Sequence, residues 1–295
     1  MAEHFSIPQS GLIRGFEWCG ERIPYPEPHI KGDTFPMTWA SDGEIYASAG
    51  DPGWEMTPDG PGDERLAPVS YAPYPGSPGW GESFTGLDVE KFSGGPTDYR
   101  IEKIHHMNDY VGWGGDGPKP TGMICVDGVL YLAFQNLLRM RQSPHSLRSQ
   151  CGADSQIVYA SLGLARYAWT PAISTIKEPM FPGYVFGGPA FINFGKNNEN
   201  ARDDHIYAVS TDQWDNGSNL RLGRAPADSI PRAGAWQWVC AWTPSGEPVW
   251  GYDLYGSIPI LSLHKWISLP DMVYLAGIKR YLLLTWHLHM DFDFV

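Results

Sequence analysis

Short stretches of alternating polar and apolar residues recur along the chain, and Gly, Pro and Asp separate them. Two pairs of such stretches are joined by an Asp-Gly dipeptide, at Asp42-Gly43 and at Asp127-Gly128. Asp-Gly between runs rich in aromatic and β-branched residues is among the strongest short-range signals for a β-hairpin. Alternation with a period of two predicts strands, and almost no stretch has the 3.6-residue period of a helix. The pattern therefore predicts an all-β protein.

The strand pattern recurs in units, which predicts a repeated architecture. The two Asp-Gly hairpins share a layout, and further strands are predicted at 155–161, 204–212 and 279–287. Irregularly spaced units of this length fit four-stranded β-propeller blades better than the strand ladder of an immunoglobulin domain. The blades are expected at 33–108, 119–170 and 187–242, with a fourth beginning near 262.

The sequence also predicts the domain boundaries and one long loop. Residues 1–30 predict an extended lead-in and 31–295 a single propeller domain, while 52–99, rich in Gly and Pro, predict a long ordered surface loop. A propeller must close on itself to protect its edge strands. Four incomplete blades do not close, so we expect a five-bladed propeller that is truncated at its C-terminus and partial in this chain.

The first hairpin carries an unusual pair of acids. Asp33 lies nine residues before Asp42, and Asp51 lies nine residues after it. A three-residue turn pairs positions whose numbers sum to 84, which places the two carboxylates opposite each other, about 4.5–5.5 Å apart at Cβ. A two-residue turn would instead pair Asp51 with Thr34 and send Asp33 to the other face. Two solvated loop acids are the simpler reading, because most Asp side chains are exposed.

Equivalent positions in the other hairpins predict a ring of polar and aromatic residues around the central channel. Blade two contributes Lys119 and Asn136, and blade three contributes the Gly187-Gly188 start with Asp212 and Trp214. Blade four contributes His264 or Trp266 with His287. Trp39 and Trp54 are expected to act as stacking platforms beside the acids, and Asp154 either faces the channel or caps a turn. Facing acids together with indoles fit chemistry on neutral sugars, with Asp33 and Asp51 as the catalytic pair.

Composition and charge narrow the partners. The net charge is −12, and Lys and Arg nowhere form a dense basic patch. Nucleic acid and anionic membrane surfaces are disfavoured, since both are bound through such patches. No apolar run approaches the ~20 residues of a membrane span, and the first residues lack the apolar core of a signal peptide. We expect a monomer that binds a polysaccharide or oligosaccharide.

The candidate metal ligands favour structural roles. Cys19, Cys125, Cys151 and Cys240 form no Cys-x-x-Cys pair, which disfavours a zinc site and leaves a disulfide open. The alternating polar residues of 287–293, two His and two Asp, would share one face of a strand, either as a metal site or as an ordinary polar face, and we favour the polar face. No metal and no cofactor are expected.

Four segments carry a resemblance to a known family, and in order they read GDTFPMTWASDGEIYASAGD, KPTGMICVDGVLYLAFQN, GGPAFINFGKNNENARDDHIYAVSTD and AGIKRYLLLTW. From about residue 30 to its end the chain resembles the propeller family first catalogued as domain of unknown function 4185, part of which is glycoside hydrolase family 183, the endo-D-arabinanases. The resemblance implies a five-bladed propeller, usually exported to the periplasm or cell exterior, that cleaves a furanose polysaccharide. It also implies catalytic acids at Asp33 and Asp51, although Ala49 replaces the usual aromatic residue before the Gly-Asp pair.

Three functional hypotheses follow. The leading one is a glycoside hydrolase that acts on a neutral, arabinan-like polysaccharide through the carboxylate pair at the channel mouth. The second is a propeller that binds glycans without cleaving them, in which the same acids accept hydrogen bonds from sugar hydroxyls. The third, a sialidase or a lyase, needs cations for an acidic sugar, and the equivalent positions provide Lys119 but no group of Arg residues.

Overall fold

The computed structural model describes residues 11–15, 17, 33–50, 87–107, 118–138, 151–172, 179–183, 185–214 and 217–286. In these ranges the regular elements are antiparallel strands and one-turn 3₁₀ helices. The all-β prediction is therefore confirmed. The strands form four separate sheets, and each of the first three contains consecutive strands in meander order.

The first sheet has the order β1-β2-β3-β4. Its strands are Met37–Trp39 (β1), Ile45–Gly50 (β2), Leu87–Ser93 (β3) and Arg100–Met107 (β4). The turn between β1 and β2 places Gly43 at a φ of 92°, as the hairpin prediction requires. β3 contradicts the prediction of an unbroken loop over 52–99. Its alternation is hard to recognise because two acids, Asp88 and Glu90, are buried between its apolar residues, and Asp88 forms an ion pair with Lys103.

The second sheet has the order β5-β6-β7-β8, with β9 also paired to β7. Its strands are Pro118–Val126 (β5), Val129–Leu138 (β6), Cys151–Ser161 (β7), Thr170–Pro171 (β8) and Phe181–Pro182 (β9). Asp127 and Gly128 form the turn of the predicted hairpin, which has two residues because Val126 pairs with Val129, and their φ values are 49° and 74°. Positive φ at both positions defines the type I′ turn, whose twist matches that of the flanking strands.

Two predicted blade boundaries, the end of the third blade and the start of the fourth, differ from the observed sheets. The third sheet contains Gly188–Phe191 (β10), His205–Thr211 (β11), Asn219–Pro226 (β12), Gln237–Trp242 (β13), Pro248–Gly251 (β14) and Leu261–Ser262 (β15). It extends beyond the predicted end at 242, because β14 pairs with β13 and β15 pairs with β12. The fourth sheet therefore begins not near 262 but at β16, Ser268–Leu275, which pairs with β17, Arg280–Trp286.

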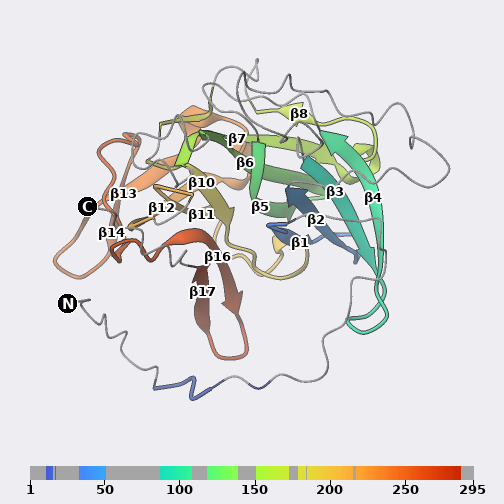
Figure 1. The fold of residues 1–295 in the computed structure, drawn as a ribbon. Helices are drawn as coiled ribbons and strands as arrows, with labels where there is room; N and C mark the ends of the chain where they lie inside the picture. The colour runs from blue at the N-terminus through green and yellow to red at the C-terminus, as the bar shows by residue number, and fades with distance from the viewer. Residues whose placement is uncertain are drawn as a thin grey trace, which may run out of the picture.

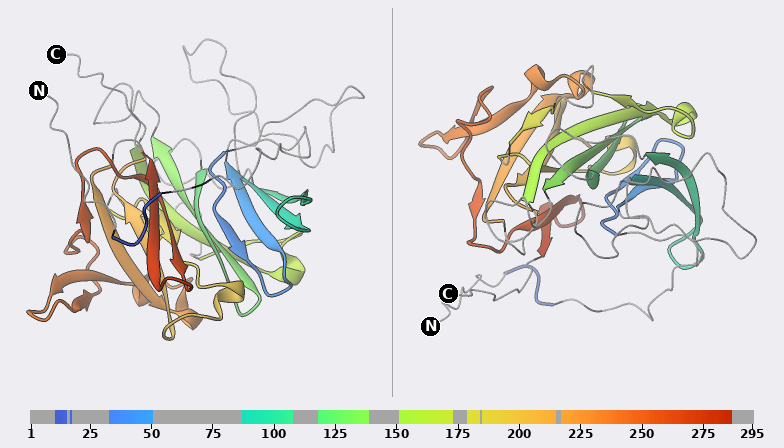
Figure 2. Two further views of the ribbon diagram at one scale, coloured as in Figure 1. Left: turned by 90° about the horizontal axis from the view of Figure 1, so that it is seen from below. Right: turned by 45° about the horizontal axis from the view of Figure 1, so that its top comes forward.

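The four sheets follow one another around the molecule in chain order, from blue and teal through green and orange to red (Figures 1 and 2). Neighbouring sheets meet through their first strands, since β1 contacts β5, β5 contacts β10, and β10 contacts β16. The first strand of each sheet is therefore the strand nearest the common centre.

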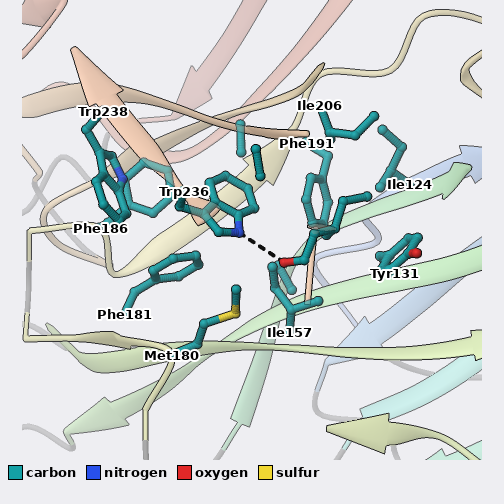
Figure 3. Close-up of a cluster of buried hydrophobic side chains, with 14 of the residues drawn as sticks. Ile124, Tyr131, Ile157, Met180, Phe181, Phe186, Phe191, Ile206, Trp236 and Trp238 are labelled. Carbon is teal, nitrogen blue, oxygen red and sulfur yellow. Dashed lines mark hydrogen bonds between the residues drawn. The ribbon is translucent and has the colours of Figure 1, made fainter. Parts of the chain in front are cut away.

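Buried apolar side chains fill the spaces between neighbouring sheets. The cluster between the second and third sheets is the most aromatic, and Trp236, Phe181 and Phe186 pack there edge to face or tilted (Figure 3). The buried Trp236 indole donates its N–H to the carbonyl of Ile230 over 3.0 Å (Figure 3). A second cluster joins the first sheet to the second, and a third joins the third sheet to the fourth.

One asparagine links the first strands at the centre. The Asn193 amide accepts a hydrogen bond from the Thr38 hydroxyl at 2.8 Å and donates to the Met123 carbonyl at 3.1 Å. The backbone of Asn193 also forms a bridge to Val273 of β16. This single side chain and its backbone therefore connect the innermost strands of all four sheets. The segment around it, FINFGKNNEN, therefore has a structural role.

Candidate functional site

A pocket of about 160 Å³ lies where the first strands of the four sheets begin. Segments from every sheet contribute to its wall: Thr34, Phe35, Pro36, Pro120, Thr121, Gly188, Thr211, Leu269, Pro270 and Asp271. Asn193 lies further along the same strands, at Thr38, Met123 and Val273. The pocket is thus at the N-terminal ends of the innermost strands, and the asparagine link lies beyond it.

Asp33 lies at the rim of this pocket. Its carboxylate accepts a hydrogen bond from the hydroxyl of the pocket residue Thr34 at 3.2 Å. Its backbone forms a bridge with Gly50, in which both N–H···O distances are 2.8 Å. A Cβ atom on Gly50 would lie 2.8 Å from Pro120 Cδ and 3.1 Å from an Asp33 carboxylate oxygen. Glycine at position 50 therefore allows the acid, the strand end and the pocket wall to approach closely.

The predicted register of the first hairpin is correct near the turn and wrong at the open end of the hairpin. Met37 pairs with Ala47 and Trp39 with Ile45, so the predicted sum of 84 is confirmed there. Asp33 instead faces Gly50, one residue short of the predicted partner Asp51. Thr34 accounts for the offset, because its φ of 51° interrupts the extended backbone between the two pairings. Asp51 lies outside the described residues.

Two residues of the pocket wall have a strained backbone. Thr34 and Leu269 have φ values of 51° and 41°, in the left-handed region that favours glycine. A β-branched or bulky residue in this region is an outlier, costs on the order of 1–3 kcal/mol and tends to occur at functional sites. The two strained positions come from different sheets and meet at one pocket. The strain therefore makes the pocket a candidate functional site on grounds that do not depend on its acids.

Asp271 is the pocket acid that the sequence analysis missed. Its side chain reaches solvent, yet protein atoms crowd the carboxyl group, and this desolvation raises the pKa of Asp271 despite a backbone hydrogen bond from Met272. The wrong start of the fourth sheet explains the omission, since it moved the expected innermost strand to His264 and Trp266. A boundary at Ser268 would have placed Asp271 among the first residues of that strand.

The polar groups of the wall are mostly engaged in holding it together. The Thr121 hydroxyl donates to the Pro189 carbonyl at 2.7 Å, and the Thr211 hydroxyl donates to the Ile267 carbonyl at 2.9 Å. Gln135 is not part of the wall but lies behind it, is 1% exposed, and its Nε2 atom has no hydrogen-bonding partner among the described residues. That atom lies beside Gly188, 3.5 Å from the position of an ideal Cβ there.

The predicted residues of the third sheet have structural positions. The Asp212 carboxylate accepts hydrogen bonds from the Ser218 and Asn219 backbone N–H groups, at 3.0 and 3.3 Å, and from the Asn219 side chain at 2.7 Å. These contacts join the residue after β11 to the beginning of β12. Trp214 is 6% exposed, so its ring faces are not available as a stacking platform. Neither residue belongs to the pocket wall.

The remaining predicted site residues do not line the pocket. Lys119 lies in β5 next to Pro120, whereas Trp39 lies at the turn end of β1, where its indole donates to the Gly43 carbonyl at 3.1 Å. Asp154 is fully buried in β7, the third strand of its sheet, opposite Asn136 and Pro182. His264 and Trp266 are exposed in the connection between β15 and β16. Trp54 and His287 lie outside the described residues.

The described residues contain no group of three or more His, Cys, Asp or Glu side chains placed to hold a metal ion. Cys125 and Cys240 are free thiols. In the same parts of the chain, no helix has the length and apolarity needed to cross a membrane.

Comparison with known proteins finds similarity to solved structures alone. No protein-family model and no curated protein matches the chain. The chain is similar to a "putative hydrolase" of Bacteroides ovatus at 13% identity and a TM-score of 0.49, covering 88% of this chain and 64% of that one. It is also similar to a protein of unknown function from Dyadobacter fermentans, at 14% identity and a TM-score of 0.44 over 88% and 76% of the two chains. A structure titled RS223-Beta-xylosidase matches at 8% identity and a TM-score of 0.41 over 87% and 86%.

Proposed function

We propose that the four sheets are consecutive blades of a five-bladed β-propeller and that the chain is a glycoside hydrolase whose active site is the pocket at their centre. Successive antiparallel sheets that meet through their first strands support the propeller, in which blades surround a central channel. The pocket lies at one end of that centre.

The observation that carries the proposal is the content of the pocket. Its volume, about 160 Å³, is close to the ~150 Å³ of an engineered protein cavity that binds benzene, and therefore suits one sugar ring. Asp271 lines it, Asp33 lies at its rim, and no described residue of its wall is Lys, Arg or His. A wall of hydroxyls, prolines and carboxyls without a cation fits a neutral ligand.

Glycoside hydrolysis requires two carboxyl groups with different protonation states on either side of the scissile bond. Asp33, beside the Thr34 hydroxyl, is proposed as the ionised carboxylate that accepts a proton from the water attacking the anomeric carbon, with Asp51 as the partner that the sequence suggests. Asp271, whose pKa is raised by burial, is proposed as an additional carboxyl that donates a proton to the leaving group. The family resemblance makes a furanose polysaccharide of the arabinan type the proposed substrate.

The proposal is tested by the release of reducing ends from arabinan. Wild-type protein is expected to release them, and Asp33→Asn is expected to lower the rate by about 10²–10⁴-fold, the usual contribution of a positioned proton-transfer group. Asp204→Asn is the matched control. Asp204 is an exposed acid that directly precedes β11, whereas the pocket residue Thr211 lies at the other end of that strand. Full activity of Asp33→Asn would contradict the assignment.

A non-catalytic glycan-binding propeller is the second candidate, because the same wall could hold a sugar by hydrogen bonds alone. Binding to glycans without release of reducing ends, across neutral furanose and pyranose polysaccharides, would favour it. A sialidase or lyase is disfavoured, since the described wall of the pocket offers no cation for the carboxylate of an acidic sugar.

A further inference from the structure

Phe35 is the only aromatic residue among the described residues of the pocket wall. The other apolar members of that wall are Leu269 and three prolines, Pro36, Pro120 and Pro270. Phe35 is half-buried, so part of the residue remains accessible. Ligand pockets are typically lined by apolar and aromatic side chains, with a few polar groups that fix the orientation of the ligand. The wall thus offers one flat aromatic surface to a bound molecule.

A β-bulge brings Phe35 to the pocket. The hairpin ladder is regular as far as Pro36, whose carbonyl accepts a hydrogen bond from the Ser48 N–H at 3.2 Å. It resumes with the bridge between Asp33 and the last residue of β2, so Thr34 and Phe35 together lie opposite one residue of β2. Thr34 is the inserted residue, with its φ of 51°. Bulges are over-represented next to active sites, where they re-aim a side chain.

We propose that Phe35 is the stacking platform of the pocket, against which one C–H face of the bound sugar ring packs. The inference rests on the proposed function in that the ligand is taken to be a sugar. The negative face of an aromatic ring attracts the weakly positive C–H groups on one side of a sugar. The tryptophans expected to stack do not provide this surface at the pocket, since Trp39 lies at the turn end of β1 and Trp214 is buried.

The platform is tested by NMR, because the ring current of an aromatic side chain shields the protons stacked on its face. Methyl arabinofuranoside is titrated with the full chain, and its affinity and the bound-state shifts of its C–H protons are measured. Wild-type protein is expected to shift protons on one face of the sugar upfield. Phe35→Leu keeps an apolar side chain but has no ring current, so it is expected to abolish this shift and to bind about tenfold more weakly, equivalent to ~1.4 kcal/mol.

Two further variants separate stacking from a purely structural role of Phe35. Phe35→Tyr keeps the aromatic face and is expected to retain both the affinity and the upfield shift. Tyr167→Leu removes an aromatic side chain that is 73% exposed and does not belong to the pocket wall, and it is expected to bind as wild type does. Unfolding temperatures are measured for every variant, so that loss of the shift is read only in folded protein.

The outcomes separate the platform from the proposed function. Wild-type protein that binds the sugar without an upfield shift would overturn the platform and leave the hydrolase intact, and this result needs no variant. An upfield shift that survives in Phe35→Leu, or that is lost in Trp39→Leu instead, would overturn it as well. Failure of wild-type protein both to bind the sugar and to release reducing ends from arabinan would overturn the sugar ligand itself, and the platform with it.

Discussion

At the scale of single residues, the pocket brings together groups that are costly to keep where they are. Thr34 and Leu269 have left-handed backbones, Gln135 holds an unpaired buried amide, and burial raises the pKa of Asp271. Each feature reduces stability, and all four lie at or beside one pocket. Such concentration is expected where a protein gives up stability for function.

The variant Asp271→Asn separates the effect of this carboxyl group on stability from its effect on activity. A carboxyl with a raised folded-state pKa binds its proton more tightly when folded, so wild-type stability falls as pH rises from the unfolded-state value of about 3.9 through the folded-state pKa. Asparagine removes this dependence, and the variant is expected to gain stability relative to wild type between pH 4 and pH 7, as measured by urea unfolding. Identical pH dependence of the two proteins would contradict the assignment.

Activity should change in the opposite direction. If protonated Asp271 donates the proton, the wild-type rate declines as pH rises through the pKa of Asp271, and Asp271→Asn loses that decline together with about 10²-fold or more of the rate. The measurement is the pH profile of reducing-end release, with Asp204→Asn as the matched control.

At the scale of elements, neighbouring sheets approach so closely that side chains are excluded. Gly122 lies beside the bulge in β5, where the pairing with β6 shifts between Pro120 and Gly122. A Cβ atom there would lie 2.6 Å from the Pro189 carbonyl oxygen and 2.9 Å from Ala190 Cα. Both atoms belong to the backbone of β10, so the two innermost strands touch main chain to main chain.

Gly122→Ala is therefore expected to destabilise the fold by about 1–3 kcal/mol, because overpacking can be relieved only by moving a strand. Gly163→Ala, with open space around the added methyl group, should change stability little. Chemical denaturation of the two variants measures the difference, and equal midpoints would show that β5 and β10 separate without cost.

At the scale of the whole molecule, the sheets are held together by apolar clusters between neighbours and by Asn193 at the centre. The clusters join sheets in pairs, whereas Asn193 contacts strands of all four. Loss of its amide would leave the Thr38 hydroxyl and the Met123 carbonyl without this partner. The side chain thus contributes to the arrangement of the pocket as well as to stability.

Asn193→Ala is expected to lower the free energy of unfolding by about 2 kcal/mol or more, since each buried group left unpaired costs on the order of 1–3 kcal/mol. Asn200→Ala, at an exposed position in the same segment, serves as the control. Thermal and urea unfolding measure the effect. A variant as stable as the control would show that the apolar clusters alone hold the sheets in place.

The sequence alone determined the elements whose signals are local. Strand alternation and the Asp-Gly turns identified both hairpins and the all-β class, because period-two patterning and positive φ at glycine are properties of neighbouring residues. Counting along the first hairpin also placed Asp33 at its open end, but opposite Asp51 rather than opposite Gly50. β3 was missed because buried acids disguise its pattern, and the start of β16 was misplaced because β15 pairs with the preceding sheet.

Only the tertiary structure decided which residues share the pocket. Thr34, Thr121, Gly188 and Asp271 come from the beginnings of four different sheets. Counting from the hairpin turns predicted a ring around the centre that included Gly188, but it did not indicate that Thr34, Thr121 or Asp271 would line it. The tertiary structure also shows that Trp39 and Asp154 lie away from the centre and that the Gln135 amide lies beside Gly188. The physical reason is that long-range packing between sheets, rather than local propensity, sets these contacts, and a one-residue offset at Thr34 is enough to change which groups face each other.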